Sequence, residues 1–188
     1  SHIPADRIAR GVVMPMNLSE NILLMNTHKP DFCQGMFLQW NRINRYADEI
    51  IKKYNVKTPS RSEQMQNLSG GNQQKVVLGR EIERTPQLLI AMHPARGLDI
   101  GATNFVQKTI VEERDRGTAV LLVSTELEEI QALSDRIAVM FEGQIMGIVP
   151  PDTPIHEISM MMAGIHYEDI QKETAAQAAQ GSAPQADA

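Results

Sequence analysis

Short uninterrupted apolar runs alternate with amphipathic stretches in the second half of the chain. The runs are Leu88–Met92, Ala119–Val123 and Ile137–Phe141. Runs of this length are typical of strands buried on both faces of a parallel sheet. Helix-like stretches at about 102–116 and 126–134 separate the runs. Strand–helix–strand alternation of this kind predicts an α/β fold with right-handed crossovers.

In the first half of the chain, the apolar residues recur with a helical period instead. A short helix is expected from Ser19, a good N-cap, through Leu24. A strongly amphipathic helix follows, ended by Pro59 and the polar residues 60–63. Its apolar positions recur at helical spacing and are Trp40, Ile43, Tyr46, Ala47, Ile50, Ile51 and Tyr54. Another helix is predicted over 72–84, and Glu142-Gly143-Gln144 predicts a hairpin that returns through 145–149.

These patterns divide the chain into four regions. Residues 1–34 are mixed, 35–86 form a helical subdomain, and 87–165 form an α/β core lobe. Residues 166–188 are expected to be a disordered tail, because from about residue 171 the chain holds almost nothing that could be buried.

Composition narrows the class of protein. With 188 residues, 42% of them hydrophobic, the chain can form one globular domain and a small second lobe. A net charge of -5 does not favour a nucleic-acid surface. The single cysteine, Cys33, excludes an internal disulfide and suits a reducing compartment. No apolar run approaches the roughly 20 residues that span a bilayer, and no signal peptide is visible. The opening Ser1-His2-Ile3-Pro4, without Met, indicates an N-terminus cut from something longer.

The most informative stretch is Ser69-Gly70-Gly71 at the mouth of a predicted helix. Glycine lets backbone approach an anion closely, and the helix start offers unpaired N–H groups and the positive end of its dipole. The Ser69 hydroxyl adds a donor. A phosphate-facing turn is one interpretation, and a flexible loop that merely caps a helix is the other.

The longer string resembles a known family. Leu68-Ser69-Gly70-Gly71-Asn72-Gln73-Gln74-Lys75 is similar to the signature motif of ATP-binding cassette (ABC) ATPases, in the form found in carbohydrate and nucleoside importers. Residues 94–102 resemble the D-loop region, and 121–130 resemble the switch strand and its helix. The likeness extends from the first residue to about Gly164. It implies an α/β, partial P-loop ABC ATPase domain: a helical signature lobe plus a parallel sheet lacking the Walker A segment.

Several positions depart from the family pattern. Where the family places an aspartate for the metal and a glutamate for water, this chain has Met92 and His93. A thioether is a poor magnesium ligand, and without the aspartate His93 is interpreted as a strand-end residue rather than a base. Thr125 replaces the switch histidine, and Ala5 stands at the expected Q-loop glutamine. The resemblance therefore implies a degenerate hydrolytic site, with this segment inactive alone.

The same resemblance implies a role in trans. Two ATPase halves of the family pair head to tail, so Ser69, Gly70, Gly71, Asn72 and Gln73 would close over ATP held by a partner half. ATP and Mg²⁺ would be held mainly by that partner. Asp99, in the D-loop region, would cross the interface to help position the partner's catalytic groups.

The expected whole is an importer for sugars or nucleosides, docked to permease subunits on the cytoplasmic face of the membrane. A non-catalytic regulatory or scaffolding module, and a fragment whose sheet is completed elsewhere, remain alternatives. A soluble ABC ATPase acting on DNA or in translation is disfavoured by the form of the signature and the lack of a basic surface. An exposed patch at Met36, Phe37 and Trp40 could receive a permease segment, although Trp40 could also pack inside the helical lobe. The methionines at 160–162 are interpreted as core filler, and the histidines have no metal-ligand spacing.

Overall fold

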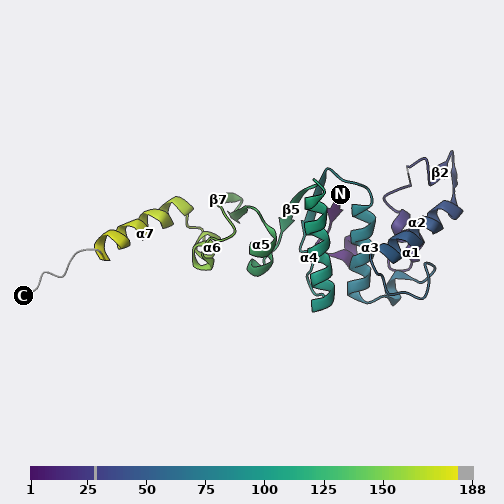
Figure 1. Cartoon of the computed structure of the whole chain (residues 1–188), viewed down its shortest axis with the longest axis horizontal. Helices are drawn as coiled ribbons and strands as arrows, with labels where there is room; N and C mark the ends of the chain where they lie inside the picture. The colour runs from purple at the N-terminus through teal and green to yellow at the C-terminus, as the bar shows by residue number, and fades with distance from the viewer. Residues whose placement is uncertain (28, 182–188) are drawn as a thin grey trace, which may run out of the picture. The chain divides into compact units, whose positions relative to one another are not determined.

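The computed structural model describes residues 1–27 and 29–181, and the chain divides into two compact units, Ser1–Ser124 and Thr125–Ala188. Figure 1 labels helices and strands in chain order. The first unit contains β1 (His2–Ile3), the π-helical turn η1 (Arg7–Gly11), α1 (Leu18–Leu23), β2 (Cys33–Gln34), β3 (Phe37–Leu38), α2 (Trp40–Lys53), the 3-10 turn η2 (Met65–Asn67), α3 (Gly70–Ile82), β4 (Leu88–Met92), α4 (Ile100–Asp115) and β5 (Ala119–Val123).

The first unit contains a three-stranded parallel sheet in the order β1-β4-β5. The predicted strands at 88–92 and 119–123 are confirmed, and the fold is the predicted α/β class. Leu89 and Ala91 are fully buried on one face. They share a core with Val76 of α3 and Val106 of α4, so these helices cover that face.

The other face of this sheet is uncovered within the first unit. Leu88, Leu121 and Val123 are 46%, 53% and 39% exposed. Their side chains alternate with buried ones along β4 and with half-buried ones along β5, as the pleat of a strand requires. The expectation that β5 is buried on both faces is therefore wrong for the described residues.

The start of α1 differs from the prediction. Asn17, not Ser19, caps the helix: its Oδ1 accepts from Glu20 N at 2.9 Å, while Glu20 Oε2 accepts from Asn17 N at 2.8 Å. This reciprocal capping box satisfies two amides that a helix start otherwise leaves unpaired. Ser19 is buried inside the helix.

The amphipathic helix α2 confirms its apolar pattern, since Ile43, Ala47 and Ile50 are buried. It ends at Lys53, well before Pro59, because Asn55 adopts a left-handed φ of 49°. Trp40, at its first turn, is 45% exposed rather than packed inside the helical lobe.

Helix α3 begins at Gly70, two residues before the predicted start, and packs against α1, α2, α4, η1 and β1. Its approach to α2 is close at Gly79, where a Cβ would lie 2.8 Å from Ile50 Cγ2 and 2.9 Å from Tyr54 Cδ2. Tyr54 donates to Glu83 Oε1 at 2.8 Å, and burial together with this carboxylate raises the pKa of Tyr54. Burial, with Glu83 nearby, raises the pKa of Tyr46 to about 12.

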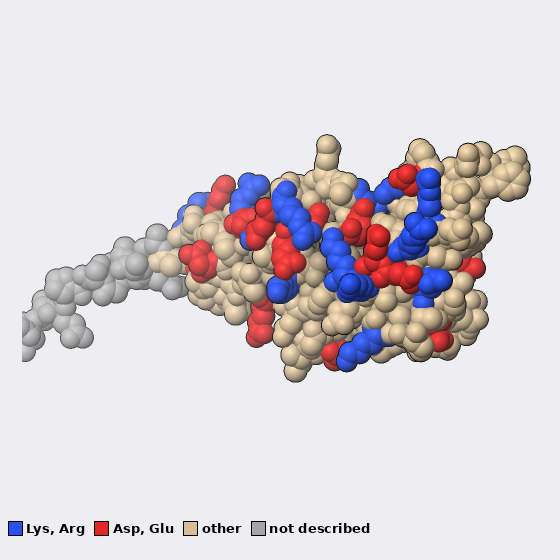
Figure 2. All heavy atoms as spheres, turned by 45° about the vertical axis from the view of Figure 1, so that its right-hand side comes forward, with Lys and Arg blue, Asp and Glu red and all other residues tan. Residues whose placement is uncertain are grey.

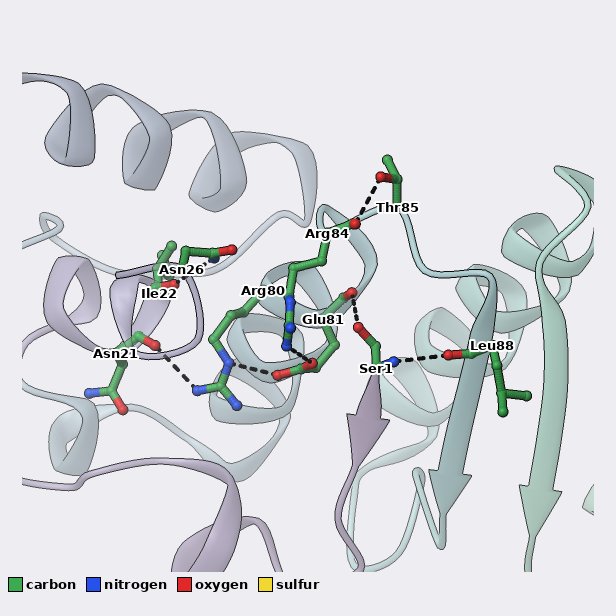
Figure 3. Close-up of polar contacts among 9 residues, drawn as sticks. All are labelled: Ser1, Asn21, Ile22, Asn26, Arg80, Glu81, Arg84, Thr85 and Leu88. Atoms are coloured by element: carbon green, nitrogen blue, oxygen red, sulfur yellow. Dashed lines mark hydrogen bonds and ion pairs between the residues drawn. The ribbon is translucent and has the colours of Figure 1, made fainter. Parts of the chain in front are cut away.

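A buried ion pair lies within α3, and hydrogen bonds that involve the same two residues link the helix to neighbouring segments (Figure 3). Arg80 Nε lies 3.0 Å from Glu81 Oε1, with both side chains at most 5% exposed. Arg84 reaches the other carboxylate oxygen of Glu81 at 3.2 Å. Arg80 Nη1 also donates to Asn21 O at 3.2 Å, and Ser1 Oγ donates to Glu81 O at 2.8 Å. A buried charge network of this kind stays favourable only while every member is paired.

The second unit contains α5 (Leu127–Leu133), β6 (Ile137–Phe141), β7 (Gln144–Val149), α6 (Ile155–Met162) and α7 (Tyr167–Gly181). The predicted hairpin is confirmed, with Glu142 and Gly143 at φ of 46° and 80°. β6 pairs antiparallel with β7 alone among the described strands, so its expected place in the parallel sheet is wrong.

Helix α7 begins at Tyr167, inside the segment 166–188 that is expected to be a disordered tail. Ile170 is 2% exposed and packs in a core with Met161 and Val149, so this segment does contribute buried apolar surface. Residues 182–188 of the predicted tail lie outside the described residues. Met161 is fully buried, as core filler would be, whereas Met162 is 46% exposed.

The division at Ser124 falls inside the expected 87–165 core lobe. A single core joins residues of the predicted 1–34, 35–86 and 87–165 regions up to Leu122. Among the described helices, none is long and apolar enough to cross a bilayer.

The α2–α3 contact predicts the effect of enlarging Gly79. Gly79→Val should overpack the interface and lower the free energy of unfolding by about 1–3 kcal/mol. Amide hydrogen exchange in α3 should then accelerate by roughly tenfold or more. Lys108→Val, which introduces the same side chain on the exposed face of α4, is the control. Unchanged protection of α3 in Gly79→Val would contradict the close packing.

Candidate functional site

The turn predicted to face phosphate stands at the open end of α3. Ser69 is the N-cap residue, with extended backbone at φ -61° and ψ 154°. Its side chain is exposed, Gly70 is half-buried and Gly71 is buried. The first amides of the helix have no partner within it, because no preceding turn supplies carbonyls. The turn therefore offers backbone donors beside an exposed hydroxyl.

Asn72 orients that hydroxyl. Asn72 Nδ2 donates to Ser69 Oγ at 3.0 Å, and Asn72 Oδ1 accepts from Lys57 N at 2.9 Å. Because Ser69 Oγ accepts from Asn72, its own hydrogen remains available for donation. The arrangement makes Asn72 a positioning residue for Ser69.

Gln73 faces inward, unlike the expectation that it contacts nucleotide. Its Nε2 donates to Met65 O and Leu68 O, each at 3.1 Å, and its backbone N donates to Ser69 O at 2.9 Å. The side chain is 4% exposed. These contacts brace the chain that leads into the turn, so the geometry assigns Gln73 a supporting position.

The structure brings Asp99, from the predicted D-loop region, beside the same turn. Asp99 caps α4, with Oδ1 accepting from Ala102 N at 2.8 Å. A Cβ at Gly71 would lie 2.8 Å from Ala102 Cβ and 3.5 Å from Asp99 Oδ2. Gln74 Nε2 adds a bond of 2.7 Å to Pro94 O. Glycine is thus required at position 71 by the close approach of α4. The turn at 69–71 and the predicted D-loop region pack directly against each other.

A residue that the sequence motifs did not single out also reaches this turn. The Arg7 guanidinium packs against Gly70, where a Cβ would lie 2.5 Å from Nη2. Arg7 Nη1 donates to Arg96 O at 3.3 Å. Arg7 precedes the turn by more than sixty residues, so only the tertiary fold reveals the contact.

Three of the four positions expected to depart from the family pattern lie at one edge of the sheet. The chain passes Ala5 directly after β1 and Met92-His93 at the end of β4, and carboxyl ends of parallel strands are where ligands bind in α/β folds. Ala5 provides no polar side chain. His93 has a left-handed φ of 45°, and its backbone N donates to Val123 O at 2.7 Å.

This edge does not fit a magnesium ion. A thioether and an imidazole replace the hard oxygen donors that magnesium requires, and no group of three potential metal ligands occurs among the described residues. Thr125 belongs to the second unit, so its placement relative to this edge is not described.

Known proteins are similar to this chain in sequence and in fold. No family model matches the chain. It is 49% identical over 172 residues to the guanosine import ATP-binding protein NupO of Bacillus subtilis (strain 168), which covers 91% of this chain and 34% of the relative. It is 44% identical over 164 residues to the nucleoside import ATP-binding protein NupA of Lactococcus lactis subsp. cremoris (strain MG1363), covering 87% and 32%.

Ribose-type importers are also similar, including the ribose import ATP-binding protein RbsA of Clostridium perfringens (strain 13 / Type A), 35% identical over 86% of this chain. The chain spans about a third of the length of the curated relatives it matches.

A solved structure has the same fold. It is the dimeric post-hydrolysis state of an ATP-binding cassette protein bound to ADP and phosphate, with a TM-score of 0.60 over 76% of this chain and 60% of that chain. Sequence identity is 19%, so this likeness shows the fold alone. The fold is that of an ABC ATPase domain, and along nearly its whole length the chain is homologous to ABC import ATP-binding proteins of the nucleoside and sugar type.

Proposed function

We propose that this chain forms part of the ATP-binding component of an importer for nucleosides or sugars, and that it closes over ATP held by a partner half. The observation that carries the proposal is the exposed Ser69 at the unpaired start of α3. A hydroxyl donor, helix amides and a helix dipole converge there on one side, as an anion requires.

The contacts of the turn support a separate proposed role for each of its residues. Ser69 and the backbone of Gly70 and Gly71 donate toward phosphate oxygens, while Asn72 holds the Ser69 hydroxyl. Gln73 braces the preceding loop and Gln74 links the helix to the D-loop. Asp99, packed beside Gly71, is carried with the turn toward the partner's site.

The chain's own sheet edge is proposed to be non-hydrolytic. ABC ATPases hydrolyse ATP with Mg²⁺, which neutralises charge on the phosphates. Ala5, Met92 and His93 supply no carboxylate for that ion at this edge, so Mg²⁺ and ATP would be held mainly by the partner half. The result is an asymmetric pair of ATPase halves, in which residues 69–72 of this chain form a lid over the ATP of the partner half.

The uncovered face of β4 and β5 supports the presence of further ABC structure. Parallel sheets are almost always covered on both faces, yet Leu88 and Leu121 are about half-exposed. The chain corresponds to only part of its relatives. An additional α/β segment packed on this face would complete the sheet of the ATPase half to which this chain belongs.

The exposed apolar tip of the β2–β3 hairpin is the proposed binding surface for a permease subunit. The β2–β3 hairpin turns at Gly35, leaving Met36 and Phe37 95% and 77% exposed, with Trp40 close behind in sequence. Figure 2 shows this end of the first unit, at the upper right, without acidic or basic side chains at its tip. An uncharged aromatic cluster of this kind is typical of the core of a protein interface. The component would accordingly sit on the cytoplasmic face of the membrane, held by its permease.

Introducing a carboxylate at Ser69 tests the lid. Ser69→Glu in the assembled importer should reduce ATP hydrolysis by at least about 100-fold, because a negative side chain opposes phosphates at a site where single donors matter to that extent. The exposed position makes misfolding an improbable cause. Gln87→Glu, which adds the same charge before the amino end of β4, should leave hydrolysis unchanged.

Normal hydrolysis by Ser69→Glu would exclude the lid role. If this variant also bound its partner proteins equally well with and without ATP, the scaffolding function would be favoured instead.

Replacing the side chains at the degenerate edge tests the asymmetry. The double variant Met92→Ala, His93→Ala should retain hydrolysis of the assembled importer within about threefold, whereas loss of a general base costs about 100-fold or more. Steady-state phosphate release measures the difference. A drop of the larger size, with nucleotide binding intact, would show that His93 takes part in catalysis.

The hairpin tip predicts a specific effect on assembly. Phe37→Glu should weaken binding of the ATP-binding component to its permease by about tenfold or more, as truncation of an aromatic hot spot does. Phe37→Trp preserves an apolar aromatic and is the matched control. Equal permease binding by Phe37→Glu and the unmodified chain, measured in detergent or nanodiscs, would remove the hairpin from the interface.

A further inference from the structure

We propose that Arg7 is a cationic contact for the terminal phosphate of the partner's nucleotide, completing the edge formed by Ser69, Gly70 and Gly71. This inference rests on the proposed lid function and adds a residue that its motif does not contain. It is argued from the position of Arg7, its charge environment and its unused donors.

Arg7 is held in place by its own element. In η1, Asp6 Oδ1 accepts from Ile8 N and Ala9 N at 3.0 and 2.9 Å, and Arg7 O accepts from Val12 N at 2.9 Å. The turn contacts α3 at Gly11, where a Cβ would lie 3.5 Å from Val77 Cγ2. The backbone from which the side chain departs is therefore fixed against the signature helix.

The guanidinium occupies the space that a side chain at residue 70 would need. Nη2 would be 2.5 Å and Cζ 3.3 Å from a Cβ there. Any larger residue at 70 would displace Arg7 from the first turn of α3. A side chain at 70 would therefore act by moving the flexible end of Arg7, whereas one at Gly71 would meet the Cβ of Ala102.

Arg7 has carboxylates nearby but is not paired with one among the described residues. The start of a helix carries partial positive charge, so a cation there is unfavourable unless negative charge is nearby. Within the described residues, Arg7 forms no ion pair: Asp6 caps its own turn, and Asp99 caps α4. Arg7 Nε is shielded from solvent and has no hydrogen-bond partner there, which adds a desolvation cost.

A phosphate would relieve this arrangement. Nη1 is engaged by Arg96 O, which fixes the plane of the guanidinium between the signature turn and the D-loop. Nη2 lies against Gly70 and remains a charged donor beside the helix amides. Arginine donors to phosphate form charge-assisted hydrogen bonds, which are stronger than those of neutral groups. The ligand class that suits the site is the terminal phosphate of a nucleoside triphosphate.

The test compares Arg7→Gln, Arg7→Lys and the control Arg10→Gln in the assembled importer. Arg10 lies in the same turn and is exposed. Arg7→Gln should raise the KM for ATP by about tenfold or more, Arg7→Lys should recover part of that loss by keeping the charge, and Arg10→Gln should match the unmodified protein. Amide hydrogen exchange of residues 69–73 should stay unchanged in all three.

Two results would overturn the inference. One is an unchanged KM for ATP in Arg7→Gln. The other is equal impairment of Arg7→Gln and Arg7→Lys with faster exchange at 69–73, which would make Arg7 only a structural bridge to Arg96. Ser69→Glu separates this inference from the lid function: if Ser69→Glu abolishes hydrolysis and Arg7→Gln has no effect, only the role of Arg7 fails. If Ser69→Glu has no effect, the lid function fails as well.

Discussion

Burial of helix α3 on nearly every side beyond its first turn is the constraint on which the first unit depends. Residues Val76–Ile82 are all buried, and the helix contacts the sheet, both neighbouring helices of the helical subdomain and α4. At its far end, the hydrogen bonds from Arg80 to Asn21 O and from Ser1 Oγ to Glu81 O make rotation or sliding of the helix costly, because either movement would break buried or partly buried bonds to neighbouring segments. The near end is therefore held in a defined place while its first turn remains open.

Helix α3 has a packed end and an open end. This difference explains why residues 68–75 have different structural roles. Ser69 and Asn72 act at the open end, where the hydroxyl is exposed. Gln73 and Gln74 look equally polar in sequence but point into the protein and bond to backbone carbonyls. The two glycines lie against different neighbours, the flexible end of Arg7 at Gly70 and the Cβ of Ala102 at Gly71. The motif thus combines exposed, positioning and packing residues.

The sequence predicted the α/β class, the strands at 88–92 and 119–123, the amphipathic helix α2 and the hairpin of the second unit. These features depend on local periodicity and turn chemistry, which short stretches contain. It did not predict the capping box at Asn17, because Ser19 has a similar propensity and only the geometry of the helix start selects between them. The antiparallel pairing of β6 and the packing of Ile170 depend on tertiary partners. For the site, the motif located the turn, whereas Arg7 and the inward direction of Gln73 required coordinates.

Strand β5 has a backbone edge that pairs with β4 on one side alone among the described strands, and it presents Leu121 and Val123 outward. Unpaired amides and carbonyls beside apolar side chains form a template for another strand. A preparation of this chain by itself would consequently tend to self-associate through strand addition. Producing it together with a polypeptide that covers this edge would be the physically sensible route to a homogeneous sample.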